Sequence, residues 1–197
     1  TNGKENIKQS LINISRIKKT KLFYNDRDTY MDILIHEINR DRSYAERHGM
    51  EFSVRLNGTS DLSPEIMKKD GKNILEIFPD VQFYDYTKVY NRTKLMKFYP
   101  NYDITFSYDG YNWDQCEQFL NDGGKVAVVF DSETMPKTYK GYKVIDANGY
   151  DMRYLDPKGC IMGLEFHPIA KDGKVLYAKD IDDPFVVKTE NNPDVVM

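Results

Sequence analysis

A unit made of a short apolar strand, a polar turn and a helix recurs along this sequence. The first unit begins at 52–56, where apolar and polar residues alternate, and passes through the polar turn 57–61 to Ser63 and Pro64. Ser63 suits a helix N-cap and Pro64 the first helical position. Later units follow at spacings of roughly 20 to 30 residues, which suit parallel strands joined by right-handed helical crossovers. The repetition therefore predicts an α/β fold with a mainly parallel sheet.

Apolar runs and capping residues place the individual elements. Strands are predicted at 52–56, 81–84, 103–106, 125–130, 143–146 and 160–164. The continuous apolar run at 125–130 is typical of a strand covered on both faces. Helices are expected at about 1–21, from Asp26 or Asp28 to His48, at 64–78 as two short helices around a turn at 69–72, near 91–98 and at about 112–121. From Lys171-Asp172-Gly173-Lys174 onward, the tail is expected to form a hairpin turn with 175–177 and 185–187 on either side.

The length of the chain limits which parallel fold it can form. With 197 residues it is expected to be a single α/β domain, 1–197, with an N-terminal helical segment at 1–49 and a C-terminal hairpin and tail at 171–197. A complete eight-unit barrel takes about 250 residues, whereas about six strands fit this length. We therefore predict an incomplete (β/α) barrel of about six mainly parallel strands, with a doubly wound α/β sheet as the alternative.

Charge and hydropathy narrow the class of protein. The composition, with 40% hydrophobic and 30% charged residues, is that of an ordinary soluble globular protein. The net charge of −3 argues against a surface built for nucleic acid on every side. Residues 1–47 nevertheless hold ten basic against seven acidic residues, and the excess centres on Arg16, Lys18, Lys19 and Lys21. No apolar run approaches the roughly 20 residues of a membrane span, and no signal peptide is visible, so the predicted location is the cytoplasm and no membrane partner is expected.

Polar residues gather where the predicted strands end. In parallel β/α folds ligands bind beyond the carboxyl ends of the strands, where loops converge and helix N-termini point inward. The catalytic candidates at this rim are Asp61, Asp85 and His167. The ligand-binding candidates are Arg55, Asn57, Thr59, Tyr86, Lys88, Ser107, Asp131, Asp151 and Arg153. Structural roles compete with these assignments, because Asp61 can cap a helix, Arg55 can pair with Asp85 on the neighbouring strand, and a lone histidine is more often structural.

Two functions remain open from these residues. In the first, an enzyme or binding protein takes a small polar or phosphorylated ligand, whose anionic group Arg55 and Lys88 would neutralise while Asp61 and Asp85 orient it or move protons. In the alternative, a non-enzymatic accessory protein binds nucleic acid or a host protein through its basic N-terminal helices, with Arg92, Lys94 and Lys97 as further contacts. The acidic net charge favours the first. The residues indicate no cofactor and no oligomeric state.

Ordered blocks of sequence carry a family resemblance. They stand at Arg55–Asp61, Phe83–Lys88, Asn101–Ser107 and Val126–Phe130, followed by 144–146, 151–157 and 163–164. Together they resemble the gene-product-88-type proteins of bacteriophages and plasmids, over most of the chain from about Lys19 to Val187. The resemblance implies a phage- or plasmid-type protein acting in a bacterial host cell, and it implies no particular reaction.

The same pattern is similar to the partial barrels of radical-SAM proteins, in which three clustered cysteines hold an iron–sulfur cluster. Here Cys116 and Cys160 are the two cysteines, without a nearby His or Cys at metal-ligand spacing, so reduced thiols and no metal site are predicted. The family resemblance implies a cysteine-rich segment upstream of Thr1, which would make this sequence part of a longer chain. It also implies Gly-Asp after the fifth strand, where Ala147-Asn148-Gly149 stands here.

Overall fold

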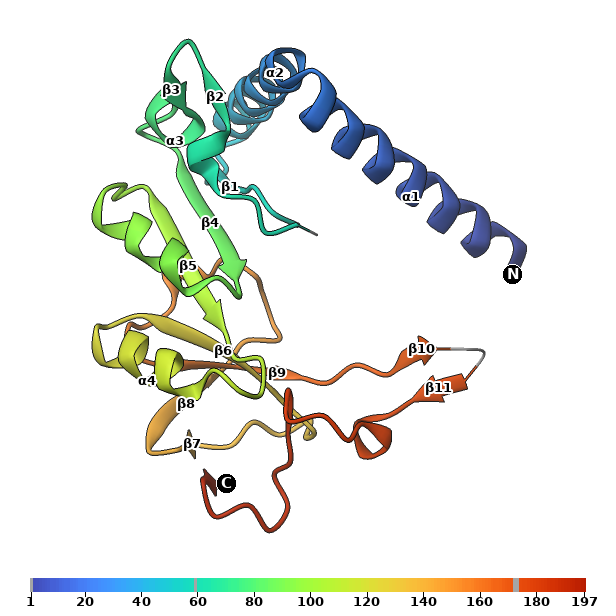
Figure 1. The fold of residues 1–197 in the computed structure, drawn as a ribbon, viewed down its shortest axis with the longest axis vertical. Coiled ribbons are helices and arrows are strands. Elements are labelled where there is room, and N and C mark those ends of the chain that lie inside the picture. The colour runs from blue at the N-terminus through green and yellow to red at the C-terminus, as the bar shows by residue number, and fades with distance from the viewer. Residues whose placement is uncertain (1, 59, 172–173) are drawn as a thin grey trace. The chain divides into compact units, whose positions relative to one another are not determined.

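The chain forms two compact units, and each draws on two stretches of the sequence. The computed structural model describes residues 2–58, 60–171 and 174–197 (Figure 1). The first unit contains the residues up to Val54 together with Leu62–Val81, and the second contains Arg55–Asp61 and Gln82–Met197. The short segment 55–61 therefore belongs with residues that follow it by more than 20 positions. Among the described residues, no helix is both long and apolar enough to cross a membrane.

Two long helices begin the first unit, α1 (Asn2–Asn25) and α2 (Arg27–Arg47). Asp26 separates them and caps α2, because its carboxylate accepts hydrogen bonds from the backbone N–H of Thr29 at 3.1 Å and from the hydroxyl of Thr29 at 2.7 Å. Phe23 in α1 packs edge-on against Tyr30 in α2, with ring centroids 5.1 Å apart. Gly49 follows the end of α2 with φ of +62°, the left-handed conformation that ends many helices. Both predicted helices are confirmed, and α1 is longer than predicted.

The segment predicted as two short helices around a turn, 64–78, contains both helices and the turn, and in addition a β-hairpin. A 3₁₀ turn, η1 (Pro64–Ile66), leads to β2 (Lys68–Lys69), which pairs antiparallel with β3 (Lys72–Asn73) before the short helix α3 (Ile74–Ile77). The two strands were not predicted; they pair because Asp70 and Gly71 both adopt positive φ, +49° and +80°, which is the geometry of a two-residue hairpin turn. Asn73 then caps α3 in a reciprocal capping box with Glu76.

In the described residues, nine strands form one sheet in the order β1-β4-β5-β6-β9-β8-β7-β13, with β12 paired to β6. The bounds are β1 Ser53–Arg55, β4 Gln82–Thr87, β5 Tyr102–Ser107, β6 Lys125–Phe130, β7 Thr138–Tyr139, β8 Tyr142–Asp146, β9 Ile161–Glu165, β12 Val186–Val187 and β13 Val195–Val196. All six predicted strands are present, as β1, β4, β5, β6, β8 and β9. The pairs from β4 through β5, β6 and β9 to β8 are parallel, as predicted.

The sheet is open, and the predicted incomplete barrel is not confirmed. Its order ends at β1 on one side and at β13 on the other, so no closed barrel exists in the part of the chain that the structure describes. The last long strand, β9, enters between β6 and β8 instead of extending the edge. Beyond β8 the short strands β7 and β13 pair antiparallel, which ends the parallel succession that a barrel would need.

The two faces of the sheet differ in chemistry. Alternate residues of β5, β6 and β9, among them Phe106, Val128 and Ile161, form an apolar core on the first face, with η2 (Tyr90–Lys97) packed on β5 and α4 (Trp113–Asn121) packed on β5 and β6. The residues between them point to the second face, where η3 (Arg153–Leu155) contacts β5. Lys125 is buried there and pairs with Asp103 at 2.7 Å. Strand β6 therefore presents only apolar side chains to the first face, whereas on the second face its first residue, Lys125, forms an ion pair.

The tail departs from the predicted hairpin. The antiparallel hairpin lies earlier, between β10 (Ile169–Lys171) and β11 (Lys174–Leu176), and its turn lies outside the described residues. A 3₁₀ turn, η4 (Ala178–Asp180), follows, and β12 then pairs in parallel with Val129 and Phe130 of β6. Strand β5 pairs with β6 only as far as Ala127, so β12 continues the same edge. Beyond Ala127 the backbone of β6 pairs with β12 instead of β5, because buried peptide groups need hydrogen-bond partners.

Gly110 gives a test of how closely the tail packs on the sheet. A Cβ atom at this position would lie 2.7 Å from the backbone nitrogen of Phe185, and φ is already +98°. Gly110→Ala is expected to lower the free energy of unfolding, measured by urea titration, because both the strained φ and the clash penalise a side chain. Gly141 is the matched control, with φ of +82° and open space around it. We expect a loss of about 1 kcal/mol for Gly141→Ala and at least twice that for Gly110→Ala. Equal losses would contradict the close packing.

Candidate functional site

Asp85 at the middle of β4 is the centre of a buried polar network that holds the segment 55–61. Its carboxylate accepts hydrogen bonds from the backbone N–H of Asn57 at 2.7 Å, from the amide of Asn57 at 2.9 Å and from the hydroxyl of Tyr102 at 2.9 Å. All three residues are at most 3% exposed. The alternation of β4 with β5 places Asp85 and Tyr102 on the same face of the sheet. Two predicted site residues, Asn57 and Asp85, are therefore in direct contact.

Asp61 closes the other end of the segment. Its carboxylate accepts hydrogen bonds from the hydroxyl of Thr87 at 2.8 Å and from the backbone N–H of Lys88 at 3.1 Å, and it forms an ion pair with Arg92. The structural alternative, in which Asp61 caps the helix that follows, is wrong, because Ser63 is the N-cap of η1. Asp61 binds the carboxyl end of β4 instead.

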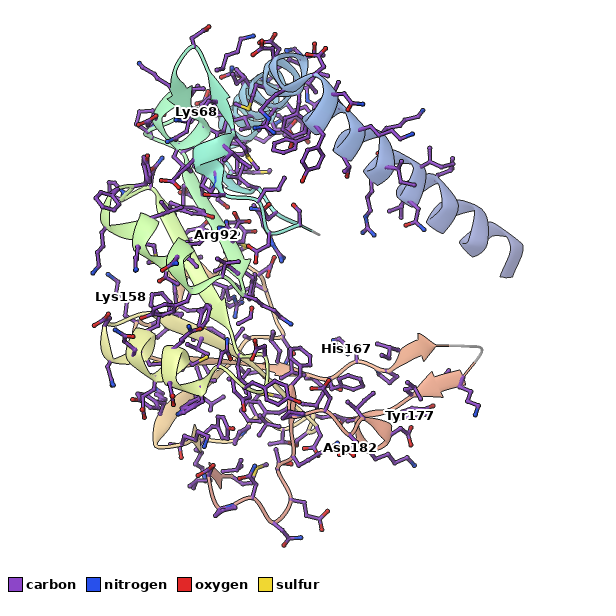
Figure 2. The ribbon with its side chains drawn as sticks, viewed as in Figure 1. Lys68, Arg92, Lys158, His167, Tyr177 and Asp182 are labelled. Carbon is purple, nitrogen blue, oxygen red and sulfur yellow. The ribbon has the colours of Figure 1, made fainter. Side chains whose placement is uncertain are left out.

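Arg92 connects the two ends of the network, a role that was not predicted for it. Its side chain is 6% exposed, and its guanidinium forms ion pairs with Asp61 and, at 3.5 Å, with Asp85, and donates a hydrogen bond to Tyr102. Figure 2 labels Arg92 beside β4. Sequence analysis considered it only as a nucleic-acid contact. The signal that could have found it was the pair of acids, Asp61 and Asp85, for which Arg55 was the one cation considered.

Burial controls the protonation of this network. Burial raises the pKa of the Asp85 carboxyl above its usual value, and the hydrogen bonds from Asn57 and Tyr102 oppose the increase. Burial also raises the pKa of the Tyr102 hydroxyl strongly, so Tyr102 remains protonated and donates to Asp85. The network can hold the segment 55–61 in place because both carboxylates accept hydrogen bonds from fixed donors, while the Nε of Arg92 has no hydrogen-bond partner among the described residues.

Four predicted ligand-binding residues meet on the second face of the sheet: Arg55, Tyr86, Asp151 and Arg153, which we name the arginine cluster. Arg55 pairs with Asp151 at 2.5 Å, and its guanidinium carbon lies 4.8 Å above the ring of Tyr86. Burial raises the pKa of the Tyr86 hydroxyl, as do the charge of Asp151 and a hydrogen bond to it, while the charge of Arg153 acts in the opposite direction. The expected pairing of Arg55 with Asp85 is wrong, since Asp151 is the partner of Arg55.

Arg153 lies in η3 and is almost completely buried. Its guanidinium is 3.1 Å from the carboxylate of Asp156 and donates a hydrogen bond to the backbone carbonyl of Tyr150, whose ring it also covers. The backbone carbonyl of Arg153 accepts a hydrogen bond from Lys125. Among the described residues, two of its nitrogens, Nε and Nη1, have no hydrogen-bond partner. Arg153 therefore fixes the crossover above β5, and its positive charge acts on the hydroxyl of Tyr86.

The remaining predicted rim residues lie apart from this cluster. The carboxylate of Asp131 accepts hydrogen bonds from the backbone N–H and the hydroxyl of Thr189, both at 2.9 Å. Lys88 is exposed, with its ammonium 4.8 Å above the ring of Phe185. Ser107 is half-buried at the end of β5. His167 is exposed between β9 and β10 (Figure 2), away from the hydrogen bonds of Asp61 and Asp85.

Two further expectations concern residues elsewhere in the chain. Thr59 lies outside the described residues. The basic residues proposed for nucleic acid, Arg16, Lys18, Lys19 and Lys21, are all exposed along α1, and that role stays a prediction.

The structure gives no support to the radical-SAM likeness. The two cysteines are free and buried, and burial raises the pKa of the Cys116 thiol to about 12, which keeps it protonated and unreactive. Within the described residues, no group of three or more His, Cys, Asp or Glu side chains could hold a metal ion.

Comparison with known proteins gives a family. A family model described as gene product 88 matches residues 3–178 of the chain. A search of curated proteins gives no match, and neither does a search of solved structures.

The buried network predicts a strong and pH-dependent effect of Arg92→Leu. Removing one partner of a buried ion pair leaves Asp61 and Asp85 uncompensated, so the free energy of unfolding in neutral buffer should fall by about 3 kcal/mol. The folded-state pKa of Asp85 is already raised, so the folded protein binds more protons than the unfolded chain, and stability falls as pH rises through that pKa. Without Arg92 this pKa rises further, so the loss should be smaller in acidic buffer.

Arg42 is the matched control for Arg92 because it also pairs with two carboxylates, Glu46 and Asp80, but is 35% exposed. Urea titration of Arg42→Leu should show a loss below about 1 kcal/mol that depends little on pH. Equal effects of the two substitutions would contradict the role of burial.

Proposed function

The chain belongs to the gene product 88 family, and we propose that it binds a small polar ligand at the arginine cluster. The observation that supports this proposal is the pairing of Arg55 with Asp151 above the ring of Tyr86. Both charged side chains keep part of their surface open, 31% for Arg55 and 46% for Asp151. They stand beyond the carboxyl-terminal half of β4, on the side of a parallel sheet where ligands usually bind.

Arg55 is arranged to receive an anionic group. A guanidinium has five N–H donors in a fixed plane, and its pairing with one carboxylate oxygen leaves others for a carboxylate or phosphate. The ring of Tyr86 supports the guanidinium plane from below, which limits the side-chain entropy that binding would cost. Arg55 also lies at the start of the segment that Asn57, Asp61 and Asp85 hold in place.

The charges of the cluster indicate the class of ligand. Arg55 and Asp151 form one pair and Arg153 and Asp156 another, so the cluster is close to neutral. A polyanion would therefore gain little there, whereas a small molecule with one carboxylate or phosphate for Arg55 and one donor for Asp151 would satisfy both. The Tyr86 hydroxyl already donates its hydrogen bond to Asp151, so its oxygen adds an acceptor beside that pair.

The same geometry favours binding over proton transfer. Asp61 and Asp85, the acids predicted for catalysis, accept hydrogen bonds from groups of the protein itself. In this proposal they are positioning residues, because they hold the segment that carries Arg55. The ligand contacts are assigned to Arg55, Asp151 and Tyr86.

The test follows the Nε–H signal of Arg55 by ¹⁵N NMR while inorganic phosphate, glycerol 3-phosphate, phosphoserine and glutamate are added separately. We expect phosphoserine or glutamate, which offer both an anion and a donor, to shift the signal at lower concentration than inorganic phosphate. Arg55→Gln should weaken that binding at least tenfold, because the bidentate contact is lost. Melting temperature should change little, since Arg55 is partly exposed.

Arg40→Gln is the matched control, because Arg40 also pairs with an aspartate, Asp41 at 2.7 Å, but is 59% exposed on α2. It should leave binding unchanged. The proposal would be overturned if no probe shifted the Arg55 signal at concentrations up to the probe's solubility limit. An equal loss of binding affinity in Arg55→Gln and Arg40→Gln would overturn it as well.

A further inference from the structure

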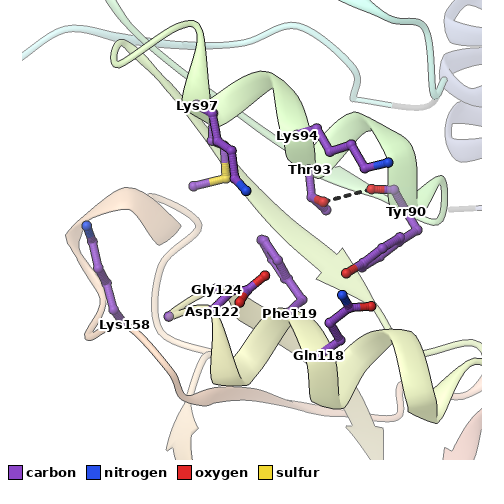
Figure 3. Close-up of a pocket in the computed structure, with 11 residues that line it drawn as sticks. Tyr90, Thr93, Lys94, Lys97, Gln118, Phe119, Asp122, Gly124 and Lys158 are labelled. Atoms are coloured by element: carbon purple, nitrogen blue, oxygen red, sulfur yellow. Dashed lines mark hydrogen bonds between the residues drawn. The ribbon is translucent and has the colours of Figure 1, made fainter.

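A pocket of about 610 Å³ lies on the first face of the sheet, between η2 and the end of α4 (Figure 3). Its lining residues come from η2, from α4 and the turn after it, and from the segment before β9. The side chains that matter for a ligand are Tyr90, Lys94, Lys97, Phe119, Asp122 and Lys158. The pocket is therefore separate from the arginine cluster, which lies on the second face.

The rim of this pocket is basic. Lys94, Lys97 and Lys158 contribute three positive charges against the single carboxylate of Asp122. In the part of the chain that the structure describes, the lysines that form salt bridges are others, namely Lys69, Lys125 and Lys140. The three pocket lysines are exposed, so their charges are available to a ligand. This surplus indicates an anion, and flexible ammonium groups suit a phosphate better than a planar carboxylate.

The floor of the pocket is aromatic and held in place by the core. Phe119 is 7% exposed and contacts Phe106 edge-on, and Tyr90 contacts Phe106 from η2 with ring centroids 5.5 Å apart. A Cβ atom at Gly124 would lie 2.4 Å from the ring of Phe119, so glycine lets that ring lie against the backbone. Rings fixed in this way provide a surface for stacking a flat heterocycle without further ordering.

Polar side chains between the floor and the rim can form hydrogen bonds with the remaining groups of a ligand. The amide of Gln118 offers a donor and an acceptor, and the carboxylate of Asp122 accepts hydrogen bonds (Figure 3). The backbone N–H groups of Gly123 and Gly124 already donate to Leu120 and Phe119, so they are not available to a phosphate. The C-terminal end of α4 carries a partial negative charge and does not attract an anion. Neutralisation of the anion therefore depends on the lysine side chains.

We propose that this pocket binds a nucleotide, with the base against Phe119 and Tyr90 and the phosphate among Lys94, Lys97 and Lys158. The combination of an aromatic floor with a cationic rim is what base stacking and phosphate neutralisation together require. Asp122 accepts a hydrogen bond from the sugar hydroxyls or from an exocyclic amino group. The nucleotide is either free or the terminal unit of a single strand, since both present the same chemistry.

Calorimetric titration of the full chain with adenosine 5′-monophosphate, ribose 5-phosphate and adenosine tests whether both halves of the pocket act together. The nucleotide is expected to bind at least tenfold more tightly than either part. Added salt should weaken nucleotide binding and leave adenosine binding nearly unchanged, because only the phosphate displaces counterions. Equal affinities for the nucleotide and ribose 5-phosphate would overturn the proposal, because the aromatic floor would then contribute nothing.

The combined variant Lys94→Gln, Lys97→Gln, Lys158→Gln should lose at least tenfold in nucleotide affinity while its melting temperature stays close to that of the parent. The matched control is Lys68→Gln, Lys72→Gln, Lys143→Gln, which changes the net charge equally at exposed positions outside the pocket. It should retain the parent's affinity. An unchanged affinity in the pocket variant, or an equal loss in both, would overturn the proposal.

A short single-stranded oligonucleotide with a 5′-phosphate distinguishes the two sources of the nucleotide. Tighter binding of the oligonucleotide than of the free nucleotide, lost in the pocket variant, assigns the pocket to a strand end. Weaker binding assigns it to a free nucleotide. Oligonucleotide binding that survives in the pocket variant and disappears in the control variant would place the contact elsewhere and contradict the proposal.

Discussion

The buried carboxylate of Asp85 is the constraint on which the candidate site depends. Burying a carboxylate lowers the free energy of unfolding unless hydrogen-bond donors and cations are held beside it. Here Asn57 donates from the segment 55–61, Tyr102 donates from β5, and Arg92 lies close by. These bonds form only when the segment 55–61 lies against β4. The network therefore determines the path of the chain between Val54 and Leu62, the two residues at which it leaves and re-enters the first unit. Arg55 stands at the start of that segment, so its position is a consequence of the same network.

The parallel sheet separates two kinds of surface. On the first face the apolar residues of β5, β6 and β9 are covered by η2 and α4, and the gap where those two elements diverge is the pocket. On the second face, Lys125 and Arg153 are buried through ion pairs, and Arg55 and Asp151 remain partly open. One strand can serve both surfaces because successive side chains point in opposite directions. Tyr86 thus supports Arg55, while its neighbours Asp85 and Thr87 hold the segment 55–61.

The two proposed sites differ in the charge they present, and this difference is physical. The arginine cluster balances each cation with a carboxylate, which suits a small molecule that carries both a donor and an anion. The pocket has an excess of lysine over acid and a rigid aromatic floor, which suits a nucleotide. The pocket lysines are exposed, and Lys94 donates a hydrogen bond to Asn91, whereas Arg55 is oriented by Tyr86 and Asp151. Selectivity in the first site therefore comes from geometry, and affinity in the second from charge and stacking.

The sequence by itself determined the periodic features of this protein: the six predicted strands, the parallel order of their core, the caps of α2 and the position of α4. It also included Arg55, Tyr86, Asp151 and Arg153 in a larger set of candidates near the strand ends. These follow from local alternation, turn residues and the rule that parallel strands end at one edge. It did not show the hairpin at 68–73, the insertion of β9 between β6 and β8, or the role of Arg92. Tertiary structure decided those, because strand order, the choice of carboxylate for each cation and the burial of a charge depend on partners distant in sequence.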